Sequence, residues 1–223
     1  MRTRTKVLAW VGGAGVVLVG AAVLVGPQLY ADHANRAAAA VPSLSAPGIS
    51  GDPTALDGTW TVGAGSFAGY RVHEVLRGID VRVTGRTSQV DGSVTVAGGA
   101  LTAADLGVDM ASVATDEPPR DTYFRNVALD VADFPTATFA LTRPVPLDED
   151  GRVGLVGDLT VHGVAKAVTV EAQVAGDRAG VDVVGSVPIT FADYGVQAPD
   201  LGFVKVDHDG SIEFSVHLTP ESP

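Results

Sequence analysis

Residues 157–170 read GDLTVHGVAKAVTV and carry the pattern on which the fold depends. Apolar and polar side chains alternate through Val153–Val161 and Ala167–Val174. An alternation of period two is typical of β-strands that bury one face. The pair His162-Gly163 lies where the chain has to reverse between the two runs. The sequence therefore predicts two strands joined by a tight connection.

The same alternation continues through most of the chain. Further runs lie at Thr59–Val62, Tyr70–Val75, Ile79–Thr84, Gln89–Val96, Val108–Val113, Thr136–Leu141, Val181–Phe191 and Ser211–Leu218. Pro118–Leu129 reads as a short helix, because paired prolines suit a first helical turn and Tyr123, Phe124 and Val127 are three to four residues apart. Many short strands with one short helix predict an all-β fold, either an antiparallel β-barrel or a sandwich.

Composition excludes several classes of function. The 223 residues include no cysteine, so disulfides, thiolate catalysis and cysteine zinc sites are ruled out. The formal net charge is −11, and the three basic residues Arg2, Arg4 and Lys6 leave −14 on the rest of the chain. Such a body repels nucleic acid and anionic lipid surfaces. We therefore expect no nucleic-acid partner.

The first 25 residues predict a membrane segment. Val7–Val25 is uncharged and follows a basic flank at residues 1–6. At 1.5 Å per residue this run spans roughly 28 Å, close to the hydrocarbon thickness of a bilayer. The basic flank keeps the N-terminus in the cytoplasm and sends the rest of the chain outward. The segment is an N-terminal transmembrane helix that acts as a signal anchor, or else a cleaved signal peptide, after which the domain is secreted.

Composition also divides the remainder of the chain. Residues 26–56 are rich in Ala, Pro, Ser and Gly and predict a flexible linker or tether. Residues 57–219 are long enough for one domain with a sizeable core, and residues 220–223 form a short tail. We therefore expect a single tethered domain.

No catalytic or metal pattern stands out. The five histidines, His33, His73, His162, His208 and His217, lack the spacing of a helical metal site. No serine has the surroundings of a nucleophile elbow. We expect neither a metal nor a cofactor.

Two stretches carry a resemblance to a known family. The run RDTYFRNVALDVADFPTATF at Arg120–Phe139, together with Gly157–Val170, is similar to the YceI-like polyisoprenoid-binding family. The likeness extends over about Asp57–Leu218. It implies a lipocalin-like antiparallel β-barrel that holds an isoprenoid chain in an apolar interior, and it favours the barrel over the sandwich. In that family a histidine often lies near the position of Glu74, whereas here His73 comes one residue earlier and should face the opposite side of its strand.

The candidate ligand contacts are apolar residues of the alternating strands and one arginine. The apolar candidates are Phe67, Tyr70, Val72, Ile79, Val81, Val83, Met110, Phe139, Leu141, Leu159, Val161, Phe191 and Phe214. Arg120 has two interpretations, which are compatible: it pairs with a neighbour at the helix start, or it stands with Arg125 near the barrel mouth and binds the polar head of an amphiphile.

The resemblance and the N-terminal segment together imply a function. We expect a membrane-anchored extracytoplasmic binding protein with a polyisoprenoid or isoprenoid quinone as its partner. One alternative is an extracellular protein-interaction or stress-response module whose barrel is filled by its own side chains, although the sequence identifies no protein partner. The other is an enzyme acting on a lipid or quinone, with Asp121, Tyr123 or His162 as acid or base.

Overall fold

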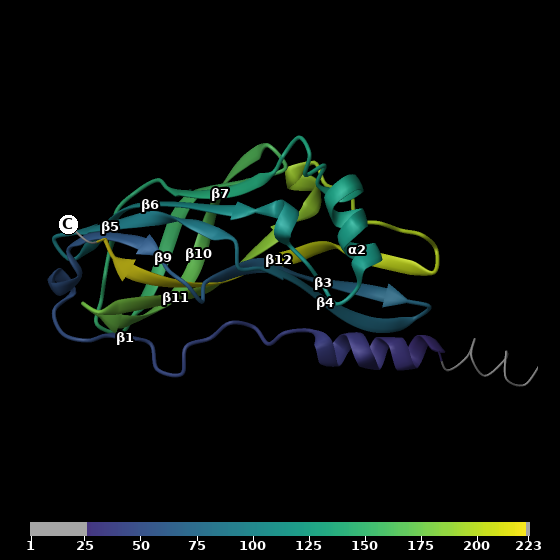
Figure 1. Ribbon diagram of the computed structural model, residues 1–223, viewed down its shortest axis with the longest axis horizontal. Helices are drawn as coiled ribbons and strands as arrows, with labels where there is room; N and C mark the ends of the chain where they lie inside the picture. Colours follow the sequence, from purple (N-terminus) through teal and green to yellow (C-terminus); the bar gives the residue numbers. More distant parts are fainter. Residues whose placement is uncertain (1–25, 222–223) are drawn as a thin grey trace, which may run out of the picture.

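The structure is a computed structural model that describes residues 26–221. A helix over residues 26–37 opens the described chain, and strands follow for most of its length (Figure 1). The strands are β1 (Gly48–Ile49), β2 (Gly58–Val62), β3 (Phe67–Leu76), β4 (Ile79–Thr87), β5 (Val90–Ala97), β6 (Ala100–Asp109), β7 (Thr136–Leu141), β8 (Val145–Pro146), β9 (Arg152–Val161), β10 (Val164–Asp177), β11 (Gly180–Thr190) and β12 (Val204–Pro220). The short helical segments are η1 (Pro53–Leu56), η2 (Met110–Ser112), α2 (Pro118–Tyr123), the π-helix η3 (Phe124–Ala128) and η4 (Phe191–Tyr194).

Eight strands close into an antiparallel barrel. The order runs β10, β9, β7, β6, β5, β2 and β12, and β11 closes the ring by pairing with both β12 and β10. Closure leaves the ring without a free edge and gives every strand one face toward a common interior. The predicted all-β antiparallel barrel is confirmed.

The long strand β12 has a different neighbour on one side at each of its two ends. Its last residues, Leu218–Pro220, pair with β2, whereas Val204–Ser215 pairs with β3. The register shifts between Val206 and Gly210, so the strand bends there. At one end the wall therefore continues through β2 into β5. At the other end it continues through the hairpin β3–β4, which we call the open end because the cavity described below opens there.

The helix 26–37 covers the β3–β4 hairpin. Ala31 and Ala34 are buried against Val81 and Val83 of β4. The Asn35 side chain donates to the backbone carbonyl of Asp80 (3.1 Å) and accepts from the Arg82 amide (2.8 Å). The Asn35 side chain thus hydrogen-bonds to backbone groups at the edge of β4, as a neighbouring strand would.

The rest of the predicted linker also lies along the barrel. Ala39 and Ala40 accept hydrogen bonds from Arg71 (2.6 Å) and Arg86 (2.7 Å), and the Leu44 amide donates to the Gln173 side chain (3.2 Å). Further on, β1 pairs in parallel with β10. Figure 1 shows this segment, residues 38–52, running beside the barrel from the open end to the far end; we call it the strap. Where composition predicts a flexible linker over residues 26–56, the structure has a helix and an extended segment that hydrogen-bonds to β3, β4 and β10.

Two locally predicted elements have the expected form. His162 and Gly163 both have positive φ (51° and 71°), as the two-residue type I′ turn between β9 and β10 requires. The helix predicted for Pro118–Leu129 begins at Pro118 and widens into the π-helix η3. Asp121 fixes its start, since Oδ1 accepts from the amide (2.8 Å) and the hydroxyl (2.7 Å) of Thr115.

The membrane prediction concerns residues outside this description. The transmembrane segment expected at 7–25 and its flank at 1–6 lie before Gly26, where the described chain begins. Within residues 26–221, none of the helices has both the length and the apolar composition needed to cross a bilayer.

Candidate ligand-binding cavity

The barrel encloses a cavity of about 840 Å³ with an almost wholly apolar lining. Leu56 and Trp60 line it at the β2 end, and the indole Nε1 of Trp60 donates to the Leu56 carbonyl (2.8 Å), which satisfies the only polar atom of that side chain. Leu201 and Phe203 line it at the open end. The volume lies within the range of small-molecule sites in proteins. The interior can thus take up an extended apolar ligand without the core having to open.

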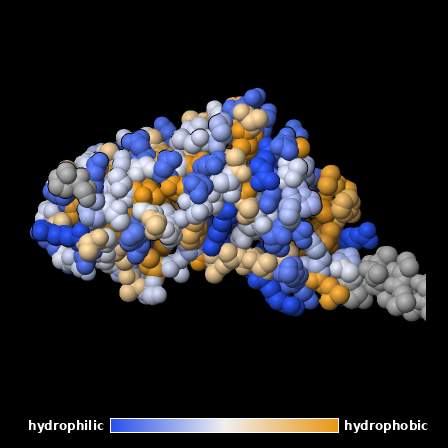
Figure 2. Space-filling model, viewed as in Figure 1, coloured by the Kyte–Doolittle hydropathy of each residue, from blue (hydrophilic) through white to orange (hydrophobic). Residues whose placement is uncertain are grey.

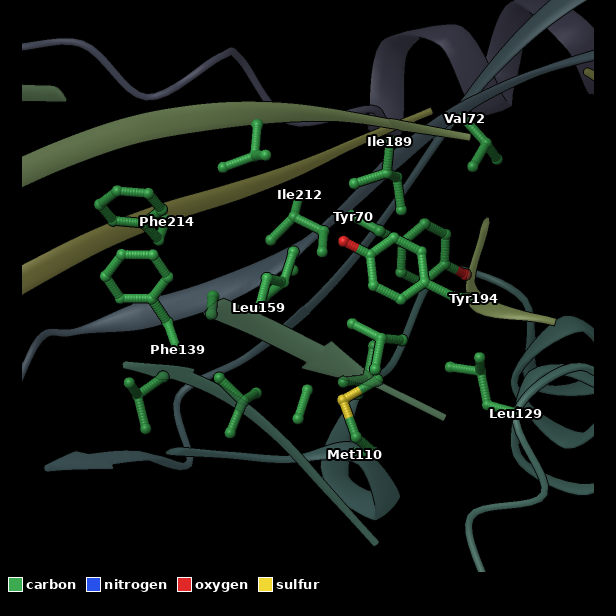
Figure 3. A pocket seen from close by; sticks show the side chains of 18 of the residues that line it. Tyr70, Val72, Met110, Leu129, Phe139, Leu159, Ile189, Tyr194, Ile212 and Phe214 are labelled. Atoms are coloured by element: carbon green, nitrogen blue, oxygen red, sulfur yellow. The ribbon is translucent and has the colours of Figure 1, made fainter. Parts of the chain in front are cut away.

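Aromatic rings packed over glycines shape the middle of the cavity. Phe139 and Phe214 face each other there in Figure 3. A Cβ at Gly157 would lie 2.5 Å from the Phe139 ring, and one at Gly185 would lie 2.5 Å from the Phe214 ring. Because these two positions lack side chains, both rings can lie close to the wall instead of filling the interior.

A second aromatic pair lies nearer the open end. Tyr70 of β3 stacks on Phe124 of η3, with ring centroids 5.0 Å apart and an interplanar angle of 12°. Tyr70 rests against Gly85 on the neighbouring strand, where no Cβ could be accommodated. Met110, Leu129 and Tyr194 line the same region (Figure 3). The π-helix thereby becomes part of the cavity wall.

The charged groups of the lining lie at the mouth. Arg120 of α2 donates to Asp116 (2.9 Å) and to the Tyr30 hydroxyl (2.9 Å), and its guanidinium lies 3.5 Å from Glu74 of β3. Tyr30 belongs to the helix 26–37. We call these four residues the mouth cluster; it links the N-terminal helix, β3 and α2.

Burial and charge shift the pKa values of this cluster. Burial raises the pKa of the Glu74 carboxyl, and the positive charge of Arg120 opposes that rise only in part. Burial also raises the pKa of the Tyr30 and Tyr70 hydroxyls. Burial alone would lower the pKa of Arg120, but Tyr30, Glu74 and Asp116 outweigh it and the pKa is raised. Arg120 stays charged, and carboxylates already surround that charge.

Nine of the fourteen predicted contacts line the cavity. These are Tyr70, Val72, Met110, Arg120, Phe139, Leu159, Val161, Phe191 and Phe214. Leu141 lies outside the lining and packs against the main core. Phe67 also lies outside it, with the Arg86 guanidinium 4.3 Å from the centre of its ring.

The remaining three predicted contacts belong to β4. Ile79, Val81 and Val83 pack with the helix 26–37 and are absent from the lining. Val83 pairs with Val72 and Val81 with Glu74, so they share the face of the hairpin that points inward. The prediction that they line the cavity is corrected because that helix covers them.

Other lining residues were missing from the prediction. They include Tyr30, Trp60, Glu74, Ile189, Tyr194, Leu201, Phe203 and Ile212. Ile189 and Ile212 lie in runs that alternate with period two, which was the available signal. Tyr30 lies in a segment whose composition predicts a linker, and Leu201 and Phe203 lie in a loop.

Residues 60–218 match the YceI-like domain, which is most of the chain and nearly all of the barrel. The chain belongs to the YceI-like family.

Relatives in this family are distant. Protein YceI of Escherichia coli O157:H7 is 34% identical over 107 residues, which is 44% of this chain and 53% of that protein. A UPF0312 protein of Vibrio campbellii is 33% identical over 96 residues, which is 39% of this chain and 49% of that protein. The chain therefore spans about half the length of these relatives.

Solved structures of the YceI-like fold agree in architecture. A polyisoprenoid binding domain from Saccharophagus degradans, implicated in plant cell wall breakdown, superposes with a TM-score of 0.59 at 20% identity, covering 73% of this chain and 98% of that one. BcnA of Burkholderia cenocepacia gives 0.55 at 21% identity, covering 66% and 95%. At these identities the likeness shows the fold alone.

In this YceI-like barrel His73 and Glu74 face opposite sides of β3, as expected from the position of His73 one residue before Glu74. Glu74 lines the cavity, whereas His73 lies half-exposed and bonds to Asp207 (2.9 Å) and Asp80 (3.2 Å). The acidic residue, and not the histidine, therefore faces the cavity.

Two of the three residues considered for acid–base chemistry, Asp121 and His162, have structural partners. Asp121 accepts two hydrogen bonds from Thr115, and His162 Nδ1 donates to the Tyr194 carbonyl (3.1 Å). The His162 ring also packs edge-on against Phe134. Tyr123 lines the mouth. Among residues 26–221, no three His, Asp or Glu side chains are grouped so that they could hold a metal ion.

Proposed function

We propose that this YceI-like chain is a membrane-anchored, extracytoplasmic binding protein that holds the hydrocarbon chain of an isoprenoid lipid in its barrel. The observation that carries this proposal is an apolar cavity of about 840 Å³ whose charged lining residues, Glu74, Glu117 and Arg120, lie at the mouth. The Saccharophagus degradans protein of the same fold, described as a polyisoprenoid binding domain, supports the choice of ligand.

Burial of hydrocarbon is sufficient for binding. Each methylene removed from water contributes about 0.8 kcal/mol. A chain of roughly twenty carbons therefore offers more than the 8 kcal/mol that corresponds to micromolar affinity, even after ordering costs of several kcal/mol. The binding needs no cofactor and no chemical step.

The mouth cluster favours a neutral polar head group. The charge of Arg120 is already matched by Glu74 and Asp116, and Glu117 also lines the mouth. A diphosphate would meet more negative than positive charge there. An isoprenoid quinone or alcohol can accept a hydrogen bond from Arg120 or Tyr30 without bringing a charge of its own. Such a head group suits the site better than the phosphate that Arg120 and Arg125 suggest in the sequence. Arg125 donates instead to the Val113 carbonyl (3.3 Å).

The anchor and the location are part of the proposal. Support comes from the uncharged run Val7–Val25 and its basic N-terminal flank. The barrel would then stand outside the cytoplasmic membrane. The alternative of a protein-interaction module with a filled barrel finds less support, because the interior is hollow.

A pair of alanine variants tests the cargo. Ala104 lines the cavity, whereas its neighbour Ala103 on the same strand does not. We expect Ala104→Trp to occupy the interior and Ala103→Trp to leave it open. The full-length protein and both variants are purified from an isoprenoid-producing bacterium, and isoprenoid per protein in organic extracts is measured by mass spectrometry.

The expected result is near-stoichiometric isoprenoid with the wild-type protein and Ala103→Trp, and a loss of at least tenfold with Ala104→Trp. Equal isoprenoid in all three samples means that the lipid comes from residual membrane. Equal isoprenoid in all three samples, or no isoprenoid in any of them, rejects the proposed cargo.

A further inference from the structure

Large apolar side chains are exposed around the mouth of the cavity. Leu201 is 59% exposed and Phe203 is 54% exposed, although both also line the cavity. Leu29, on the helix 26–37, is 64% exposed and precedes Tyr30, which lines the mouth. Figure 2 shows hydrophobic residues gathered at this end of the molecule. We call Leu29, Leu201 and Phe203 the mouth rim.

The rim is fixed to the barrel. The Arg77 amide, in the β3–β4 turn, donates to the Phe203 carbonyl (2.9 Å). Within the loop, the Leu201 amide donates to the Val204 carbonyl (2.9 Å), and the Val206 amide donates to the Pro199 carbonyl (3.0 Å). These bonds fix the backbone of the loop that carries Leu201 and Phe203 at the end of the hairpin. Large apolar side chains exposed to water are a typical feature of an interaction surface.

The sequence ahead of the described chain indicates what covers the rim. Gly26 precedes Tyr30 by four residues, which is about 6 Å along a helix. The uncharged run Val7–Val25 ends immediately before Gly26. If that run lies in a bilayer, the cavity mouth is within a short distance of the lipid surface. Figure 1 shows the helix 26–37 and the loop before β12 at the same end of the barrel.

The net charge of the molecule disfavours electrostatic attachment to a membrane. The −14 that follows the basic flank opposes electrostatic adsorption to anionic lipids. Apolar side chains, in contrast, gain free energy from burial in the interface whatever the charge of the head groups. Leu and Phe on an exposed loop are side chains of this kind.

We propose that the mouth rim inserts into the outer surface of the bilayer, so that the cavity opens directly into lipid. This deepens the proposed function and rests on its anchor, but not on the identity of the cargo. An isoprenoid chain would then move between bilayer and barrel without crossing water, where each exposed methylene costs about 0.8 kcal/mol.

The chain lacks cysteine, which makes a site-specific label straightforward. Phe203→Cys places a thiol on the rim, and Ala179→Cys places one on the exposed β10–β11 turn, which adjoins the β2 end of the barrel. Each full-length variant carries an environment-sensitive fluorophore and is reconstituted in phosphatidylcholine vesicles made without isoprenoid. Nitroxide-bearing lipids then report contact with the bilayer by quenching.

We expect at least threefold stronger quenching at position 203 than at 179, with a blue-shifted emission at 203. A label at Leu201→Cys should behave like the one at 203. Leu29→Ser combined with Leu201→Ser should weaken quenching at 203, whereas Val41→Ser, which removes an exposed side chain from the strap, should not. Circular dichroism checks that each variant is folded.

Equal quenching at 203 and 179, or none at either site, overturns the docking proposal. Because the vesicles contain no isoprenoid, the result is independent of cargo. Quenching at 203 together with empty extracts would keep the docking surface and remove the proposed ligand. Bound isoprenoid together with an unquenched label at position 203 would keep the proposed ligand and reject the docking surface.

Discussion

The guanidinium of Arg120 lies 3.5 Å from the carboxylate of Glu74, where α2 meets β3 at the cavity mouth. Both side chains are largely buried, so the free energy of each charge depends on the other. The Tyr30 hydroxyl accepts from the same guanidinium and brings the N-terminal helix into the arrangement. Through Tyr30, the pair therefore joins charges that line the cavity to the N-terminal helix, which lies outside the barrel.

Glu74→Gln should change how stability depends on pH. Burial raises the pKa of the Glu74 carboxyl, so the folded protein binds this proton more tightly than the unfolded chain does. In the wild type, this group lowers the free energy of unfolding as pH rises from about 4.5 to the raised pKa, after which its contribution stays constant. Glutamine removes that dependence.

Urea denaturation of wild type and Glu74→Gln between pH 4 and pH 8 measures this effect. The stability of the wild type relative to the variant should fall across the lower part of that interval. Parallel curves would show that Glu74 does not titrate differently in the two states.

Gly185→Ala should disturb the middle of the cavity. The new Cβ would lie 2.5 Å from the Phe214 ring, which would have to move away from the wall. We expect a loss of about 1–3 kcal/mol in the free energy of unfolding, as for overpacked cores, and weaker uptake of added isoprenoid. Gly154→Ala is the control, because its nearest neighbour, a Glu171 side-chain oxygen, is 3.7 Å away. Similar losses in both variants would contradict the role of the ring.

Asn35→Ala should loosen the edge of β4. The Arg82 amide donates to the Asn35 side chain and would lose that partner. Hydrogen exchange of this amide should accelerate about tenfold, which corresponds to roughly 1.4 kcal/mol of lost protection. Arg36→Ala, on the exposed side of the same helix, should leave the rate unchanged. An unaltered Arg82 rate in the Asn35 variant would mean that the helix does not cover this edge in solution.

Glu213→Ala should be strongly destabilising. This carboxylate is almost completely buried and receives hydrogen bonds from Arg71 (3.1 Å to Oε2) and Arg86 (3.4 Å). Its removal leaves two guanidinium groups without their common anion, which typically costs about 3–5 kcal/mol. Asp182→Ala, which breaks the exposed pair with His217, should cost at most about 1 kcal/mol. Comparable midpoints of urea unfolding for the two variants would refute this assignment.

The barrel could be predicted because period-two alternation reports which side of a strand is buried. That signal placed Phe139, Leu159 and Phe214 on the inward face. It could not distinguish a residue that faces ligand from one that faces another element. Val81 and Val83 lie on the inward side of the hairpin, yet the N-terminal helix covers them.

The signal for that helix was present in the composition. The stretch ADHANRAAAA at 31–40 is rich in alanine, the strongest helix former, and Ala31 and Ala34 are three residues apart on one face. Read together with the Pro and Ser that follow, it predicted a linker. Glu74 was missed for a related reason: it interrupts the apolar series Tyr70, Val72 and Leu76, and a charge at such a position marks a buried pair or a ligand contact.

The strap lies between the N-terminal end of the described chain and the first barrel strand, so a pull on that end would act on the strap first. It runs beside the barrel and pairs in parallel with β10 at Gly48 and Ile49, while Arg71 and Arg86 hold its beginning. Tension applied ahead of Gly26 would reach the bonds of the helix and of Ala39 and Ala40 before it reached the first barrel strand. With the chain anchored as proposed, the barrel would therefore be held through its strap, and not directly through β2.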